Sequence, residues 1–268
     1  MTSVSEIPNP TSSSQVTSHK AKPDVLVITS ELPWPLNTGG HIRSFHVLKA
    51  LSKQFDVRGI AGVEMADDPG LQAHGRNGIR VVQTFQNKRN PFAEFGRVAR
   101  ALLREEPYVM FNRHNRPAMR QAIRQQLAEK TPDVIYLDHL DPLAFRGLFP
   151  KVPIVADLHN VYSTLAKRVA SERKFPVNLY LHNESRLLSY MEKQVAAAAS
   201  VITTVSDMER GHLQSSVDEP FGWCPTVSIV PRSVSIPSDG ITHSRRCSIW
   251  EHSPGNRTRK PPSSWLAK

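Results

Sequence analysis

A carboxylate and an imidazole, Asp157 and His159, lie one residue apart at the end of an apolar run, and Asn160 follows them. Residues i and i+2 of a strand point to the same face, so both side chains would emerge together where the strand ends. Such a pair can bind a polar substrate. We therefore take His159 as the candidate catalytic residue, with Asp157 and Asn160 as candidate substrate contacts. The alternative is that His159 caps the strand and bonds only backbone groups.

The same Asp-x-His pattern resembles the opening of metallophosphatase sites, in which carboxylate and imidazole groups bind divalent cations. No Gly-Asp or Gly-Asn-His segment follows downstream to complete such a site, and His139 with Asp141 is only a loose second candidate. The two cysteines of the chain are too few for a four-thiolate zinc site. We therefore expect no metal site.

A second candidate site is the segment ELPWPLNTGGHIRSF, residues 31–45, which follows another apolar run. Gly39 and Gly40 let the backbone approach a ligand closely and adopt a positive φ if the turn requires it. The helix predicted to begin there would present free N–H groups to a phosphate or sugar oxygen. The positive charge of Arg43 in its first turn opposes the helix dipole, and an anion bound beside it would stabilise that charge. The segment matches neither the Gly-x-Gly-x-x-Gly fingerprint nor a P-loop. A plain turn and a solvated Arg43 therefore stay open as alternatives.

A third polar segment, Ser206-Asp207-Met208-Glu209, has the pattern of a capping box at a helix start. The Ser206 hydroxyl would accept from the N–H of Glu209, and capping explains these residues well. Because the segment follows a predicted strand, Ser206 is also a candidate substrate contact.

Short β-branched runs separated by helical stretches must position these residues. Several runs are continuously apolar, as strands covered by helices on both faces require. Between them, apolar residues recur at helical spacing, for example from Ile42 to Phe55 and from Tyr180 to Ala198. This alternation predicts an α/β fold with a doubly wound, mostly parallel, Rossmann-like sheet that binds ligands at the carboxyl ends of its strands. The seven predicted strands are residues 24–30, 55–63, 79–85, 133–140, 152–159, 200–206 and 226–231.

The strand and helix pattern bounds a single domain at residues 24–231. Residues 1–23 are rich in Ser, Thr and Pro without an apolar period, which predicts a disordered leader. Residues 232–268 have neither a two-residue nor a 3.6-residue period and are predicted to form a disordered, low-complexity basic tail.

The formal net charge of +10 would suit a nucleic-acid partner. Residues 232–268 carry seven Lys or Arg against two acids and residues 1–23 carry two against one, so only +4 remains for the domain. That balance is ordinary, and we expect no nucleic acid as partner. No apolar run approaches the ~18 residues of a membrane span, and the start lacks the apolar core of a secretory signal. With so few cysteines, these features predict a cytoplasmic protein.

Residues 96–127 form a basic zone with seven Arg against two Glu and with interleaved apolar residues. Such a zone favours peripheral contact with an anionic membrane, here through Arg97, Arg100 and Arg104. The alternative is a solvated helical face.

Three groups of segments occur in a characteristic order. They are ITSELPWPLNTGGHIRSFHVLKALSKQFDV, then DVIYLDHLDP, then IVADLHNVYS followed by SRLLSYMEKQVAAAASVITTVSDME. Together they resemble the N-terminal domain of retaining GT-B glycosyltransferases of the glycogen-synthase-like superfamily, glycosyltransferase family 4 type. The resemblance covers roughly residues 24–231.

The resemblance implies a domain that binds the acceptor and a second domain that binds a nucleotide sugar, with the reaction in the cleft between them. Gly39 and Gly40 would match the loop that approaches the donor diphosphate, and His159 the histidine beside the reacting sugar. The implied activity is retaining hexosyl transfer from the nucleotide sugar to a glycan or a lipid-linked acceptor. It needs no cofactor besides the donor substrate, because N–H groups and cations stabilise the leaving diphosphate.

After Pro231 the chain departs from the family pattern. Arg232-Ser233-Val234-Ser235 stands where an Asn-Gly turn would lead into the second domain. This departure predicts a shortened or frame-shifted product that is inactive alone. The alternative is a non-catalytic acceptor- or membrane-binding module that partners a separate donor-binding subunit.

Overall fold

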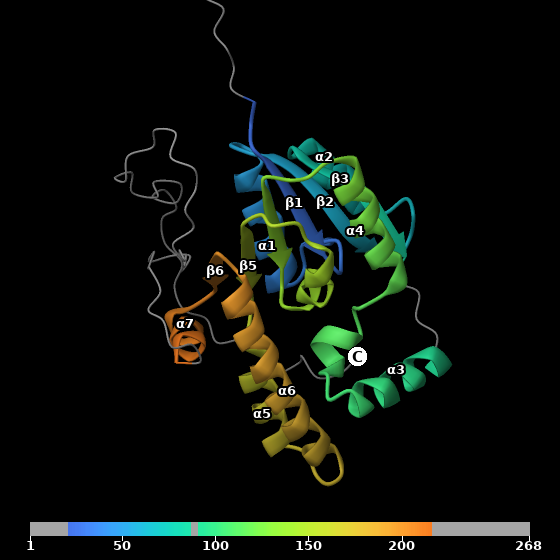
Figure 1. The fold of residues 1–268 in the computed structure, drawn as a ribbon, viewed down its shortest axis with the longest axis vertical. Coiled ribbons are helices and arrows are strands. Elements are labelled where there is room, and N and C mark those ends of the chain that lie inside the picture. Colours follow the sequence, from blue (N-terminus) through green and yellow to red (C-terminus); the bar gives the residue numbers. More distant parts are fainter. Residues whose placement is uncertain (1–20, 87–90, 216–268) are drawn as a thin grey trace, which may run out of the picture.

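The computed structural model describes residues 21–86 and 91–215. Predictions for the seventh strand at residues 226–231, for the tail at 232–268 and for most of the leader lie outside the described residues. Within them, the chain folds into one sheet with helices on both sides (Figure 1).

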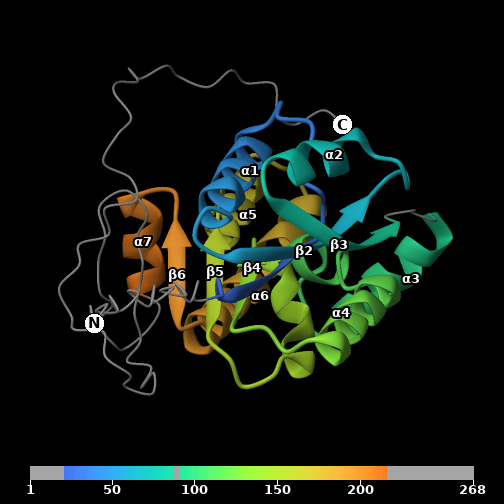
Figure 2. The ribbon, with the colours of Figure 1, turned by 90° about the horizontal axis from the view of Figure 1, so that it is seen from above.

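The sheet has six strands in the order β3-β2-β1-β4-β5-β6, and every neighbouring pair is parallel (Figure 2). Each strand begins within two residues of its predicted start, which confirms the α/β, Rossmann-like fold class. The strand order reverses between β1 and β4, the place where open α/β sheets leave a crevice. The strands are β1 (Asp24–Thr29), β2 (Asp56–Val63), β3 (Ile79–Gln86), β4 (Val134–Asp138), β5 (Ile154–Leu158) and β6 (Val201–Thr204).

Helices connect the strands, and one of them is shorter than predicted. The helix expected to reach Phe55 ends at Leu51, because the chain must turn at Ser52 to enter β2. The α-helices are α1 (Gly39–Leu51), α2 (Pro69–Arg76), α3 (Pro91–Leu103), α4 (Pro117–Glu129), α5 (Tyr162–Ser171), α6 (Val177–Ala198) and α7 (Asp207–Gln214). A short π-helix, η1 (Tyr108–Asn112), and a 3-10 helix, η2 (Asp141–Leu148), complete the described elements.

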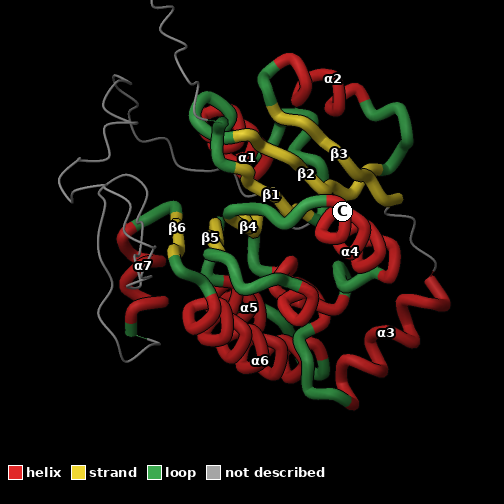
Figure 3. The backbone as a smooth tube through the Cα atoms, turned by 45° about the horizontal axis from the view of Figure 1, so that its top comes forward, coloured by secondary structure: helices red, strands yellow, loops and turns green. Residues whose placement is uncertain are grey.

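The helices α1 and α2 cover one face of the sheet, and α4, α5 and α6 cover the other (Figure 3). The strand residues alternate accordingly. Val25 and Val27 of β1 pack with Leu48 of α1, whereas Leu26 and Ile28 belong to the larger cluster on the opposite face. Because both faces are buried, β1 is apolar almost without interruption, as its sequence indicated.

The basic zone at residues 96–127 is not one surface, because it forms α3, η1 and α4 in turn. Arg97 donates hydrogen bonds to the carbonyls of Asn112, Arg113 and Asn115, so its charge holds the segment after η1. Helix α3 lies away from the sheet (Figure 1). No helix in the described part of the chain combines the length and the apolar character needed to cross a bilayer.

Candidate functional site

The candidate site lies at the carboxyl ends of β4 and β5, beside the first turn of α1. These elements bring together Asp138 from the end of β4, Asp157 from β5, His159 directly after β5, and Arg43 and Ser44 from α1. They adjoin the switch point between β1 and β4, which is where the sequence predicted that ligands bind. The topology therefore places polar residues from three segments of the chain in one cluster.

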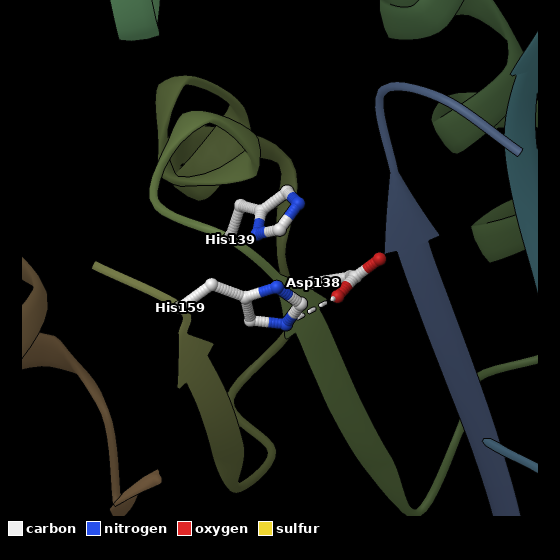
Figure 4. Close-up of side chains that lie close together, drawn as sticks. All are labelled: Asp138, His139 and His159. Atoms are coloured by element: carbon white, nitrogen blue, oxygen red, sulfur yellow. Dashed lines mark ion pairs between the residues drawn. The ribbon is translucent and has the colours of Figure 1, made fainter. Parts of the chain in front are cut away.

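His159 carries a positive charge in this cluster. Its Nε2 atom lies 3.3 Å from Asp157 Oδ2 and 3.4 Å from Asp138 Oδ1, and its side chain is buried (Figure 4). Burial disfavours the imidazolium, but the two carboxylates outweigh it and raise the pKa of His159 to about 9. These contacts are ion pairs rather than aligned hydrogen bonds, since neither ring nitrogen has a hydrogen-bond partner among the described residues. The alternative that His159 bonds only backbone is therefore wrong.

Asp157 is the buried anchor of the cluster. One of its oxygens accepts from the Arg43 guanidinium at 2.6 Å and from Thr203 Oγ1 at 2.5 Å, and the other accepts from the Tyr136 hydroxyl at 2.8 Å. Burial raises the pKa of Asp157, but His159 and Arg43 together hold it well below the usual range. Because no part of this side chain is exposed, Asp157 orients His159 and Arg43 and does not present its own carboxylate to a substrate.

Asp138 is the second carboxylate that contacts His159. Its Oδ1 atom accepts a hydrogen bond of 2.8 Å from Ser44 in α1. Burial raises the pKa of Asp138, yet the neighbouring histidines, His139 and His159, keep it below the usual value. Asp138 thereby ties β4, β5 and the start of α1 together through one carboxylate.

His139 covers His159 from the side. The two rings meet edge to face with centroids 4.0 Å apart, and His139 has a φ of 79°, a conformation that non-glycine residues rarely adopt (Figure 4). Burial lowers the pKa of His139, and its Nδ1 atom has no hydrogen-bond partner among the described residues. Burial therefore favours the neutral form of His139 more than in a solvent-exposed histidine.

Asp138, His139 and His159 are also the residues that could hold a metal ion, with one donor atom each within 4.8 Å of one another. The two carboxylates keep a proton on His159, and this proton competes with any cation for the ring. Asp141, the partner considered for His139, is not a member of this group and is instead buried beside Ser30, whose hydroxyl donates a hydrogen bond to it. The donor set thus favours a proton over a metal.

The two glycines lie in the first turn of α1, after the N-cap Thr38. Neither has a positive φ, so the backbone freedom expected of them is not used. A Cβ atom on Gly40 would lie 3.6 Å from His159 Nδ1, whereas one on Gly39 would meet nothing within 4 Å. Gly40 therefore lies next to His159, and a Cβ atom at this position would be in van der Waals contact with the ring.

The remaining predicted residues have separate positions. Arg43 is not a solvated surface residue, because Asp157 supplies the anion beside it. Asn160 is exposed just after His159. Ser206 caps α7, where its Oγ accepts from the N–H of Glu209 at 3.3 Å, which confirms the predicted N-cap. Sequence reasoning did not single out four residues of the cluster, namely Ser44, Tyr136, Asp138 and Thr203. Only Asp138 had a visible signal, as an acid at a predicted strand end.

Comparison with known proteins identifies the family. The model of Glycosyltransferase Family 4 matches residues 24–221. The chain is similar at 11% identity and a TM-score of 0.41 to the crystal structure of a protein assigned as a UDP-N-acetylglucosamine 2-epimerase from Listeria monocytogenes, over 75% of this chain and 44% of that one. A search of curated proteins gave no match. With the family model covering most of the chain, the protein belongs to glycosyltransferase family 4.

Proposed function

We propose that this chain carries the acceptor-side domain of a retaining glycosyltransferase, which moves a hexosyl group from a nucleotide sugar to a glycan or a lipid-linked acceptor in the cytoplasm. Membership of family 4 supports glycosyl transfer. The single observation that carries the proposal for the site is the buried His159 ring, which contacts two carboxylates and whose Nδ1 atom, beside Gly40, has no hydrogen-bond partner among the described residues.

In this proposal, His159 donates a hydrogen bond and supplies a fixed positive charge. With a pKa of about 9 it keeps its proton at neutral pH, so it does not serve as a general base. The donor C1–O bond breaks with its electron pair going to the diphosphate, and the acceptor hydroxyl bonds to C1 and releases its proton to the departing phosphate. The charge that develops on the diphosphate is stabilised by the imidazolium and by the first amides of α1.

The first turn of α1 has backbone N–H groups that a ligand could bind. Its first i to i−4 hydrogen bond runs from the Ile42 N–H to the Thr38 carbonyl, and the His41 N–H is capped by Thr38 Oγ1. The N–H groups of Gly39 and Gly40 precede these bonds. In this proposal these N–H groups bind the diphosphate, while Arg43 and His159 stay paired with the buried carboxylates of the cluster.

A transfer assay tests the proposal. The purified full chain is incubated with radiolabelled nucleotide sugars and a panel of glycan and lipid-linked acceptors. The chain is predicted to be inactive alone, so robust transfer by the parent would contradict that prediction. Where transfer is seen, His159→Gln is expected to abolish it and His182→Gln, at an exposed position on α6, to leave it unchanged. Equal activity in the His159 variant would contradict the role of the imidazolium. Acceptor binding without transfer would support the alternative, a non-catalytic module that partners a separate donor-binding subunit.

We also propose peripheral contact with an anionic membrane. Phe95, Leu102 and Leu103 of α3 are exposed, and Arg100 and Arg104 lie beside them. Apolar side chains flanked by cations suit the headgroup region of a bilayer, where each cation adds about 1 kcal/mol. Because Arg97 already donates hydrogen bonds to backbone carbonyls, the proposed membrane contact uses Arg100 and Arg104.

Flotation with anionic vesicles tests this contact. We expect R100E/R104E to reduce vesicle binding at least tenfold. The matched control, R168E/R173E on and after α5, is expected to bind as the parent chain does. Equal loss in both variants would show a general charge effect and would contradict a contact specific to α3.

A further inference from the structure

A groove of about 940 Å³ lies at the carboxyl ends of β1 and β2. Its walls come from the β1–α1 loop, with Glu31 and Trp34, and from the β2–α2 loop, with Glu64 and Asp68. The first turn of α1 separates this groove from the His159 cluster, because Thr38 and His41 line the groove whereas Gly40 faces His159. Its volume is in the range of small-molecule sites.

Trp34 forms an aromatic wall of the groove and is held in place by its contacts with Phe45 and the Gly70 position. Its ring packs against Phe45 with centroids 6.2 Å apart. On the other side, a Cβ atom on Gly70 would lie 2.6 Å from Trp34 Cβ and 2.8 Å from Leu32 Cδ2. Any side chain at position 70 would therefore displace Trp34. A fixed, half-buried aromatic face can pack against the C–H face of a sugar ring.

The groove is acidic although the protein as a whole is basic. Glu31, Glu64 and Asp68 line it, and no Lys or Arg is among its described lining residues. Asp68 already accepts the Gly70 N–H. Glu31 and Glu64 are exposed, so their carboxylates can accept hydrogen bonds from ligand hydroxyl or ammonium groups. The same charges repel a phosphate.

We propose that this groove is the acceptor subsite and that it takes an unphosphorylated sugar ring, either uncharged or amino-substituted. A phosphate or diphosphate on a lipid-linked acceptor then lies outside the groove. The assignment of the groove as an acceptor subsite rests on the proposed function, but its preference for unphosphorylated sugars rests only on the residues that line it. The Trp34 ring sets the orientation of the sugar, and Glu31 and Glu64 set the charge that is accepted.

Direct binding to the full chain tests the preference without any donor. The probes are methyl pyranosides of the gluco, galacto and manno series, each in neutral, 2-amino and 6-phosphate form. The readout is the Trp34 indole N–H signal in NMR spectra, assigned by its loss in Trp34→Phe from among the four tryptophans. We expect at least one neutral or amino ring to shift this signal and to bind about tenfold more tightly than its phosphate form.

Two matched pairs of variants test the two walls. Gly70→Ala is expected to weaken sugar binding about tenfold, whereas Gly75→Ala on the same helix, where a Cβ meets nothing within 4 Å, leaves it unchanged. Glu64→Gln is expected to reduce the discrimination against phosphate, and Asp67→Asn, which does not line the groove, is not. Thermal melting checks that each variant is folded.

Three outcomes would overturn the inference. The first is tighter binding of the phosphate form than of the neutral or amino form. The second is an equal effect of both glycine substitutions on sugar binding. The third is that no probe shifts the Trp34 indole N–H signal. Failure of the proposed function is a separate result, because a chain that binds sugars in this way but performs no transfer would keep the groove and lose only its assignment as an acceptor subsite.

Discussion

Asp138 and Asp157 are register partners on the parallel strands β4 and β5, so two carboxylates lie side by side in a buried position. Like charges at this distance repel strongly unless cations neutralise them. His159 contacts both carboxylates, and Arg43 bonds Asp157. The cluster contains two negative and two positive groups, and its balance depends on the proton of His159.

The first prediction concerns stability against pH. The pKa of His159 is raised from 6.5 to about 9, so the folded chain holds this proton more tightly than the unfolded chain. The resulting stabilisation is complete below pH 6.5 and is lost as the pH rises through 9. We expect the free energy of unfolding in urea to fall by about 3 kcal/mol across this window.

His159→Gln should remove this loss of stability, whereas His182→Gln on α6 should keep it. An NMR titration of the His159 ring in the parent chain gives the pKa directly if the variant does not fold. A ring that titrates below 7 would show that the carboxylates do not hold the proton.

The second prediction separates the two glycines of α1. Alanine at either position favours the helix by about 0.5–1 kcal/mol, so both variants should be at least as stable as the parent. Only Gly40→Ala places a methyl group 3.6 Å from His159 Nδ1. We expect it to reduce the transfer rate at least tenfold and Gly39→Ala to change it less than twofold. Similar rates for the two variants would mean that no ligand approaches His159 past α1.

The third prediction concerns the hydroxyl of Tyr136, which donates a 2.8 Å hydrogen bond to Asp157. Tyr136→Phe keeps the ring but leaves the buried carboxylate with one donor fewer. This loss should lower the free energy of unfolding by about 1–2 kcal/mol in urea titrations. Tyr190→Phe, at an exposed position on α6, should change it by less than about 0.5 kcal/mol. A Tyr136 effect as small as that of Tyr190 would argue against a shared hydrogen-bonded cluster.

The fourth prediction concerns Asp141, which is buried beside Ser30. Burial raises the pKa of Asp141 to about 7 from a usual 3.8, so ionising it costs stability as the pH rises from 4 to beyond 7. Asp141→Asn carries no charge and should be more stable than the parent at pH 8 by up to about 4 kcal/mol, but not at pH 4. Urea titrations at the two pH values measure the difference. If Asp141→Asn is destabilised by the same amount at pH 4 and pH 8, ionisation of the Asp141 carboxylate does not lower the free energy of unfolding.

Local patterns were sufficient for much of the fold. The continuous apolar run of β1 could be recognised because both faces of the strand are buried, and the Ser206 cap because its partner, Glu209, is three residues away. Asp157 and His159 could be paired because they are two residues apart at the end of one apolar run, although β5 itself ends at Leu158. The end of α1 at Leu51 was misplaced, since Phe55 continues the apolar spacing although the chain has already turned toward β2.

Only the tertiary structure decided what Asp138 and Arg43 do. Arg43 is 114 residues from Asp157, and Asp138 meets His159 only because β4 lies next to β5 in the sheet. Apolar spacing predicts which segments are strands, but not which strands become neighbours. The charge of His159 follows from that neighbourhood, because a pKa depends on the burial and charges around a group in space and not on its neighbours along the chain.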